Sequence, residues 1–250
     1  MDTIRDFDEF TEEGFQGLVR AAAAEWRFVP YWDCSGGGKV CLWRHDVDAS
    51  MHRALALAGV EAEANVAATY FLYPHSPFYN LLETGMGGIV ARMVEMGHFI
   101  GLHFDPGHYG INPDDKKLWE ETLLSERRLL ERSFGQPVRA FSLHNPAPLW
   151  MKALDAREEA GMVNAYHPDF LGGVFRYVSD SNGYWRYRPL RKILLEGKDE
   201  KLHVLTHPEW WTPEALSPRE RIERAVHGRA ERCLKDYDAL LARHGRNNIR

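Results

Sequence analysis

Two aspartates stand two residues apart near the end of an apolar run, in the segment Cys41-Leu42-Trp43-Arg44-His45-Asp46-Val47-Asp48. In an extended backbone, side chains two residues apart point to the same face, so the carboxylates of Asp46 and Asp48 would lie side by side. Two like charges in a dry site repel, and a bound cation removes the conflict. One carboxylate could then ligate a metal ion while the other acts as a base. An isolated Asp-x-Asp is more often a solvated turn after a strand. Support for a metal site must therefore come from other segments of the chain.

Apolar runs that end on histidine or aspartate recur at four further places. They end at His103-Phe104-Asp105, at His144-Asn145-Pro146, at Ser179-Asp180 and at His207-Pro208-Glu209. Parallel α/β sheets and barrels gather catalytic groups at the C-terminal ends of their strands. Five such endings on separate strands therefore predict one converging site.

The composition is that of an ordinary globular protein. A chain of 250 residues suits one α/β barrel or two small domains, and its net charge of −5 argues against a nucleic-acid surface. No apolar stretch approaches the ~20 residues that span a bilayer. The acidic start lacks the apolar core of a signal peptide, and the three cysteines show no CxxC spacing. These features predict a cytoplasmic protein without a disulfide framework or a thiolate zinc site.

The elements that would position these groups alternate between strand and helix. We expect a helix from Thr11, as N-cap, to about residue 26, and a C-terminal helix over 217–243 that opens with a capping box at Ser217. Further helices are expected over about 51–65, 88–96 and 114–134, the last with Glu126 on its exposed face. Strands are expected near 39–43, 66–73, 99–103, 138–143, 162–166, 174–178 and 202–206.

This alternation predicts a parallel sheet, and about seven strands with one cluster at their C-terminal ends favour a barrel over a doubly wound sheet. We expect a single domain over 1–250, with an N-terminal helix and lead-in over 1–37, the barrel motifs over 38–211 and the C-terminal helix over 217–243. The stretch 167–200 is expected to be irregular and to form loops over the site.

In order, and over roughly residues 38–211, these motifs resemble the metal-dependent polysaccharide deacetylases, carbohydrate esterase family four with its NodB homology domain. The resemblance implies a distorted (β/α)7 TIM-like barrel that removes acetyl groups from amino sugars or sugar hydroxyls. The segment His45-Asp46-Val47-Asp48 resembles the first motif, which implies that Asp46 is the base and Asp48 a metal ligand. The segment Gly97–His103 resembles the approach to the second motif and implies that His103 is the next ligand.

The chain departs from the family pattern at the third ligand. The family has a second metal-binding histidine four residues after the first, but Gly107 stands there and His108 follows one position later. His108 is the first choice for the third ligand, with Asp105 and His144 as alternatives. His98 faces opposite to His103 in a continuous strand and is expected to be structural.

The third motif resembles Leu143-His144-Asn145-Pro146, with His144 where the family has arginine. A histidine keeps a polar group beside Asp46 but titrates near neutrality. His144 and Asn145 are therefore candidates for the substrate side of the site. For His144, the roles of ligand, base-orienting group and packing all stay open.

The fourth and fifth motifs resemble Ser179–Trp185 and Val204–His207. The resemblance implies that His207 is a general acid oriented by Asp180. Trp185 and Trp210 follow these strand ends and could stack on sugar rings, with packing as a lid as the equal alternative. The ending His-Pro-Glu-Trp-Trp also resembles a branch with cytoplasmic roles in polysaccharide assembly.

The hypothesis from the sequence is a hydrolase that acts on an N- or O-acetylated carbohydrate, with no nucleic-acid partner and no membrane span. A divalent ion, Zn²⁺ by preference and otherwise Co²⁺, Ni²⁺ or Mn²⁺, would sit on Asp48, His103 and one further side chain and lower the pKa of a bound water. Two alternatives stay open. One is a metal hydrolase for another amide, ester or phosphate bond; the other is a non-catalytic carbohydrate-binding or assembly protein with the same fold.

Overall fold

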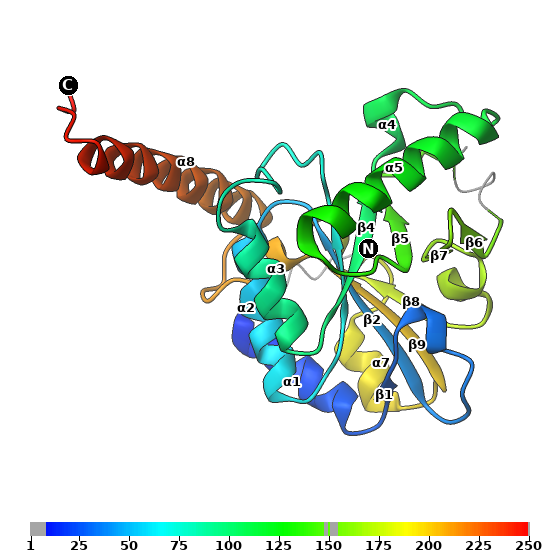
Figure 1. Ribbon diagram of the computed structural model, residues 1–250. Helices are drawn as coiled ribbons and strands as arrows, with labels where there is room; N and C mark the ends of the chain where they lie inside the picture. The colour runs from blue at the N-terminus through cyan, green and yellow to red at the C-terminus, as the bar shows by residue number, and fades with distance from the viewer. Residues whose placement is uncertain (1–8, 148–149, 151–154, 250) are drawn as a thin grey trace.

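One curled β-sheet forms the centre of the molecule in the computed structural model, which describes residues 9–147, 150 and 155–249 (Figure 1). Its strands follow the order β6-β7-β5-β4-β3-β2-β9-β8. The parallel strands of this path are β2 (Val40–Val47), β3 (Thr69–Leu72), β4 (Phe99–Phe104), β5 (Ala140–Leu143), β7 (Met162–Asn164), β8 (Arg176–Ser179) and β9 (Lys201–Thr206). The short strand β1 (Arg27–Phe28) runs parallel beside β2, and β6 (Glu158–Glu159) pairs antiparallel with β7.

The path is curled but open, because in the described part of the chain β8 does not pair with β6 or β7. The curl of the parallel sheet and the helices outside it confirm the distorted (β/α)7 barrel expected from the sequence, and the opening is part of the distortion. The division of the chain into 1–37, 38–211 and 217–243 stays a prediction.

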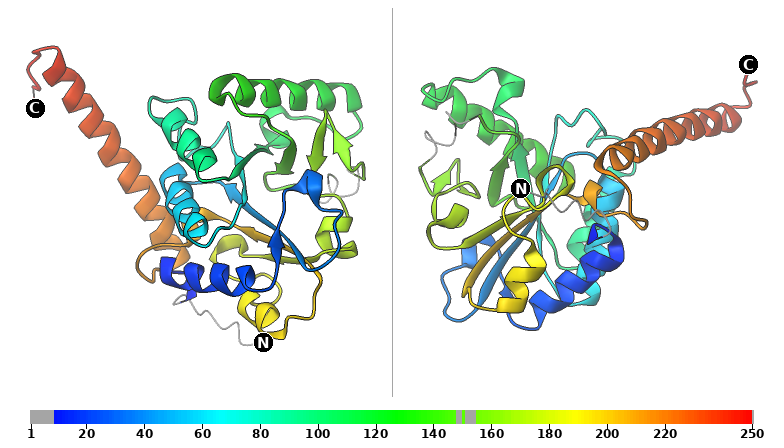
Figure 2. Two further views of the ribbon diagram at one scale, coloured as in Figure 1. Left: turned by 60° about the horizontal axis from the view of Figure 1, so that its bottom comes forward. Right: turned by 180° about the vertical axis from the view of Figure 1, so that it is seen from behind.

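Helices cover the outside of the curled sheet (Figures 1 and 2). They are α1 (Glu12–Ala23), α2 (Met51–Glu63), α3 (Met86–Glu95), α5 (Lys116–Phe134) and α7 (Leu190–Glu196), with the short α4 (Pro106–Tyr109) at one end. The last helix, α8 (Pro218–Arg243), projects away from the body. Both expected N-caps are confirmed, since Thr11 accepts from Gly14 N and Ser217 forms a capping box with Glu220.

Strand β2 is buried along its whole length and separates two apolar cores. Its odd-numbered side chains, such as Trp43, pack outward against the helices, whereas even-numbered ones, such as Leu42, belong to a second cluster inside the barrel. Gly101 of β4 faces Phe71 of β3 in that interior, and a Cβ at Gly101 would lie 2.4 Å from the phenyl ring. Only glycine leaves room for this ring at the centre of the barrel.

The structure corrects the expected strand over 39–43. β2 continues to Val47, so Arg44 and Asp46 lie within the strand rather than after it. Ladder pairing persists to Val47, opposite Leu72. The ionisable side chains do not end the strand because they find partners inside the protein.

Residues 167–200 are more regular than expected. They contain a π-helical turn over Asp169–Gly173, the strand β8 and the helix α7, whose buried residues Leu190 and Ile193 pack on the outer core. In contrast, the expected strand 66–73 is paired only over Thr69–Leu72.

Glu126 of α5 is buried, contrary to its expected place on the exposed face. Its Oε1 accepts a hydrogen bond from Tyr109 at 2.7 Å and lies 2.5 Å from His75 Nε2. Burial is the main cause that raises the pKa of Glu126, to about 7. The periodicity of α5 did not reveal this partner set, because His75 lies 51 residues away in the sequence.

None of the described helices combines the length and the apolar character needed to cross a lipid bilayer.

Candidate metal centre and active site

Three side chains from three strand ends meet at one point. Asp48 follows β2, His103 lies in β4 and His144 follows β5. Asp48 Oδ1 is 3.1 Å from His103 Nε2 and 3.4 Å from His144 Nδ1, and the two ring nitrogens are 3.3 Å apart. Together these residues form a set of possible metal ligands.

The three atoms fit a divalent cation. Zinc–ligand distances of about 2.0–2.1 Å in a tetrahedral site place neighbouring ligand atoms about 3.3 Å apart. The measured separations of 3.1, 3.4 and 3.3 Å match that spacing. In addition, Asp48 Oδ1 is inaccessible to solvent and makes no hydrogen bond of good geometry. A buried carboxylate oxygen of this kind requires compensation, which a cation among the three residues would provide.

Electrostatics at Asp48 agree with an ionised ligand. Without a cation, burial alone would raise the pKa of Asp48, but protonated His103 and His144 outweigh it and hold the pKa below its ordinary value. When the ring nitrogens present lone pairs instead, a bound cation would take over this stabilisation. A carboxylate and two imidazoles, leaving room for water, are a donor set used by catalytic zinc sites.

A hydrogen-bonded chain connects His103 to the second aspartate. The hydroxyl of Ser142 donates to Asp46 Oδ1 at 3.2 Å, and Ser142 Oγ lies 2.7 Å from His103 Nδ1. When the Ser142 hydroxyl donates to Asp46, Nδ1 of His103 carries the ring proton and Nε2 presents its lone pair toward Asp48. This is how an outer residue fixes the tautomer of a metal-binding histidine.

Arg44 is a site residue that the sequence reasoning missed. Its Nη2 donates to Asp46 Oδ2 at 3.2 Å, and both side chains are almost fully buried. Burial alone would lower the pKa of Arg44, but the charge of Asp46 raises it well above its ordinary value, so the guanidinium stays charged. The sequence did contain a signal for this residue, because Arg44, Asp46 and Asp48 occupy alternate positions of one extended segment and so share a face. His144, in the place of the family's arginine, does not provide this contact.

His207 follows β9 and approaches the centre from the opposite side. Its Nε2 lies 4.0 Å from Asp48 Oδ2, and its Nδ1 lies 2.7 Å from Asp180 Oδ1. Asp180 is buried and also accepts from Trp211 Nε1 at 2.8 Å and from the backbone of His207 at 3.1 Å. Burial alone would lower the pKa of His207, but Asp180, with the charges of Asp48 and Glu209, raises it to about 10.

His108 and Asp105, two of the candidates for the third ligand, are held apart from this centre. Asp105 caps the short helix α4 by accepting from the backbone of Gly107 and His108. The turn carries the imidazole of His108 onto that of His75, with the ring centroids 3.6 Å apart. The set of possible metal ligands that the structure brings together contains His144 and neither of these two residues.

An aromatic ring supports His144 from one side. Tyr73 stacks on the imidazole with the centroids 4.4 Å apart, and its hydroxyl donates to Asp105 at 2.6 Å. On the other side, the Asn145 amide nitrogen is 3.0 Å from His144 Nε2. An amide can present its oxygen or its nitrogen, so Asn145 can satisfy either tautomer of His144. Asn145 itself has a φ of 41° and an exposed side chain.

The two tryptophans expected on the substrate side pack against the protein. Trp185 lies against Phe10 and Trp211, with centroid distances of 5.6 and 5.9 Å. Trp210 is partly buried on the outer core, and a Cβ added at Gly183 would lie 3.3 Å from its ring. The structural role expected for His98 agrees with its burial and with its contact to Ala58 O at 2.9 Å.

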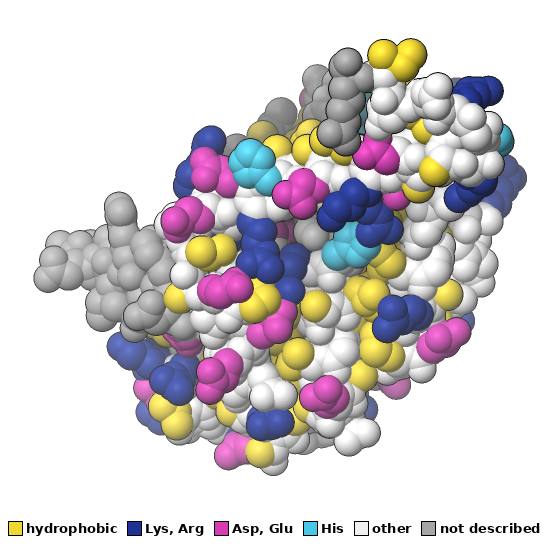
Figure 3. All heavy atoms as spheres, turned by 90° about the vertical axis from the view of Figure 1, so that its left-hand side faces the viewer, with side chains coloured by type: hydrophobic (Ala, Val, Ile, Leu, Met, Phe, Trp, Pro, Cys, Tyr) yellow, Lys and Arg dark blue, Asp and Glu magenta, His cyan; other side chains and the backbone are white. Residues whose placement is uncertain are grey.

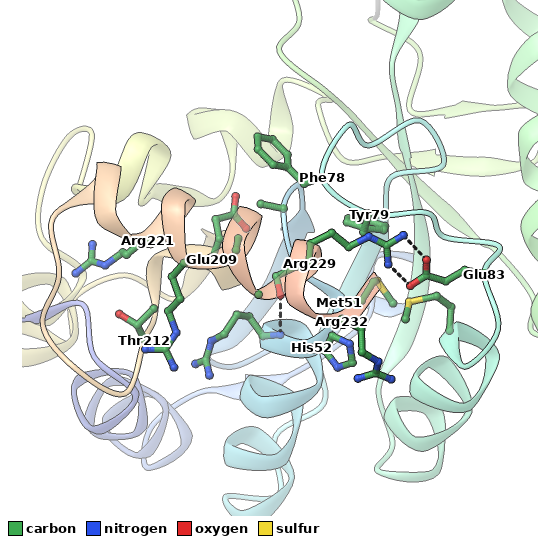
Figure 4. Close-up of a pocket in the computed structure, with 17 residues that line it drawn as sticks. Met51, His52, Phe78, Tyr79, Glu83, Glu209, Thr212, Arg221, Arg229 and Arg232 are labelled. Atoms are coloured by element: carbon green, nitrogen blue, oxygen red, sulfur yellow. Dashed lines mark hydrogen bonds and ion pairs between the residues drawn. The ribbon is translucent and has the colours of Figure 1, made fainter. Parts of the chain in front are cut away.

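A separate cavity of about 270 Å³ lies between the start of α2 and the base of α8 (Figure 4). It adjoins the site, because its lining includes Ala49, which follows Asp48, and Glu209, two residues after His207. None of the three candidate ligands lines it. On this side of the molecule, acidic and basic side chains are interspersed (Figure 3).

No protein-family model matches the chain, and no curated protein matches its sequence. Similar solved structures include a CE4 family pseudoenzyme from Bacillus anthracis, with a TM-score of 0.46 and 16% identity over 78% of this chain and 62% of that one. A family 4 acetyl xylan esterase from Clostridium thermocellum, in complex with a cobalt ion, has a TM-score of 0.42 and 16% identity over 76% of this chain and 84% of that one. A peptidoglycan deacetylase from Bacillus subtilis has a TM-score of 0.43 and 13% identity over 84% of this chain and 98% of that one. The chain thus spans less than two thirds of the pseudoenzyme's length. Two of these three structures, the pseudoenzyme and the acetyl xylan esterase, are described as members of family 4, and the third is described as a peptidoglycan deacetylase.

Proposed function

We propose that this protein is a metal-dependent hydrolase that removes acetyl groups from a sugar or a polysaccharide precursor. The observation that carries the proposal is the meeting of two independent sets of residues at one point. Asp48, His103 and His144 could hold a cation, and Asp46 and His207 lie on either side of them. The substrate class rests on the resemblance of the sequence motifs to polysaccharide deacetylases.

When bound by Asp48, His103 and His144, a divalent ion supplies Lewis-acid activation of water and of a carbonyl oxygen. Zn²⁺ is our first choice of metal because one carboxylate and two imidazoles suit it.

Asp46 is the proposed general base. Its Oδ2 lies 3.7 Å from His103 Nδ1, so the carboxylate is beside the ligand set without being part of it. Arg44 and Ser142 each donate to one oxygen of Asp46, which fixes the orientation of the carboxylate and stabilises its charged form. A carboxylate held in this way is positioned to accept the proton of the attacking water.

His207 is the proposed general acid. It carries a proton at neutral pH because Asp180 stabilises the imidazolium at 2.7 Å. Asp180 is itself fixed by Trp211, so the ring is oriented through Nδ1 and presents Nε2 to the centre. From there, His207 can donate a proton to the leaving amine or alkoxide.

Metal analysis together with acetate release from N- and O-acetylated sugars tests the proposal. The purified protein should contain one divalent ion per chain and release acetate. The variant Asp46→Asn should keep the metal but lose at least about 100-fold in acetate release, the usual contribution of a general base. Metal without acetate release would favour hydrolysis of another bond. A protein with neither metal nor acetate release would favour a non-catalytic binding or assembly role.

A further inference from the structure

Among the described residues, the contacts that fix helix α8 to the body lie near its beginning. Arg221 is buried and donates to Phe10 O at 3.2 Å. Two turns later, Arg229 forms an ion pair with Glu83, which precedes α3 (Figure 4). Beyond this pair the helix leaves the body in every view (Figures 1 and 2). Every residue over 231–240 is exposed with respect to the described part of the chain.

The projecting helix carries a mainly apolar stripe. Successive members are four and three residues apart in alternation, which is the a/d spacing of a heptad repeat: Val226, Ala230, Cys233, Tyr237 and Leu240, with the C-cap residue His244 at the next position. Leu234 and Leu241 lie next to this stripe and widen it. The exposed fractions of Leu234, Tyr237 and Leu240 are 66%, 54% and 48%. A helix draws most of its stability from the packing of such a face, so this stripe calls for a covering surface.

We propose that the projecting part of α8 pairs with the same segment of a second copy of this chain, in antiparallel orientation. Charge complementarity sets the orientation. When Tyr237 packs beside Leu240 of the second copy, the heptad spacing places Asp236 opposite Arg243 of the second copy. By the symmetry of the pair, Arg243 faces Asp236 of the second copy.

The same alignment also joins the leucines beside the stripe, because Leu234 comes to face Leu241 of the second copy. A parallel pair would set charge against apolar groups, with Asp236 beside Leu241 and Arg229 beside Leu234. Antiparallel pairing further places the two barrels at opposite ends of the helical pair, so each keeps its strand ends free.

The pairing can be tested by sedimentation equilibrium of the full chain. A concentration of about 10–100 µM is suitable, because a short helical pair would form in about this range. We expect a particle of twice 28.8 kDa. Leu234→Glu should shift it to 28.8 kDa, whereas Lys235→Glu, on the next residue of the same helix but off the stripe, should leave it dimeric. A monomeric wild-type chain, or a dimer that Leu234→Glu does not weaken, would overturn the proposal.

Orientation is tested by charge exchange and by cross-linking. Asp236→Arg and Arg243→Asp should each weaken the dimer at least about fivefold, and the double variant should recover it. Antiparallel pairing places Cys233 opposite position 244 of the second copy, so His244→Cys should give a disulfide-linked dimer on mild oxidation and the wild type should not. A wild-type dimer linked through Cys233 would indicate parallel pairing and refute the orientation. None of these readouts depends on hydrolase activity.

Discussion

The identity of the third metal ligand gives the sharpest prediction. We expect His144→Ala to weaken Zn²⁺ binding by at least about 100-fold, or about 2.7 kcal/mol. The ligand atoms form a triangle with sides of 3.1, 3.4 and 3.3 Å, and removal of His144 leaves only the 3.1 Å side between Asp48 and His103. Loss of an outer-shell partner alone typically costs 10–100-fold, so loss of a direct ligand should cost at least the upper value.

The matched control is His108→Ala, which removes the imidazole at the position that the sequence favoured. His108 packs on His75 and lies outside the ligand set, so we expect a change in Zn²⁺ affinity of less than about threefold. Affinity would be measured by competition with a chromophoric chelator at fixed pH and ionic strength, and circular dichroism would confirm that both variants fold. If His108→Ala lost the metal while His144→Ala kept it, the geometric assignment of the centre would be wrong.

Three further outcomes follow from the buried charges. Arg44→Gln leaves the carboxylate of Asp46 buried without its guanidinium partner, so the free energy of unfolding in urea should fall by about 3–5 kcal/mol. Adding Asp46→Asn should recover much of this loss. A double variant no more stable than Arg44→Gln alone would contradict the pairing. The pKa of Glu126 is raised from 4.5 to about 7, so protonated Glu126 contributes fully to the free energy of unfolding below pH 4.5, and this contribution is lost as the pH rises through 7. Glu126→Gln should therefore stabilise the chain by up to about 3 kcal/mol more at pH 9 than at pH 5. Equal shifts of melting temperature at both pH values would count against this reasoning. Asp180→Asn should lower the pKa of His207 from about 10 and move the alkaline limb of kcat/KM to lower pH, whereas an unmoved limb would remove His207 from the role of acid.

Much of the architecture was predictable from the sequence because local pattern and topology agree. The apolar runs ending in His103, His144 and His207 are strands of one parallel sheet, and their ends meet at one edge as parallel strands require. The caps at Thr11 and Ser217 followed from residue type alone.

The sequence could not decide between His108 and His144 because that choice depends on the path of a turn. Asp105 accepts two backbone hydrogen bonds and begins α4, which turns His108 away from the centre. Spacing along the chain favours His108, whereas closeness in space favours His144, 41 residues from His103. The burial of Glu126 could not be predicted from the sequence either, because its partner His75 lies in a loop that is distant along the chain.

Three groups of the proposed site come from one stretch of backbone, where Arg44, Asp46 and Asp48 alternate with outward-facing neighbours. A single inserted or deleted residue between Val40 and Arg44 would slip the register and exchange the two faces of the strand. The guanidinium and both carboxylates would then point at the apolar layer under α1 and α2, while Trp43 and His45 would enter the barrel. Length variation in this segment would therefore abolish cation binding and folding together, so engineered changes of chain length belong in the loops on either side of β2.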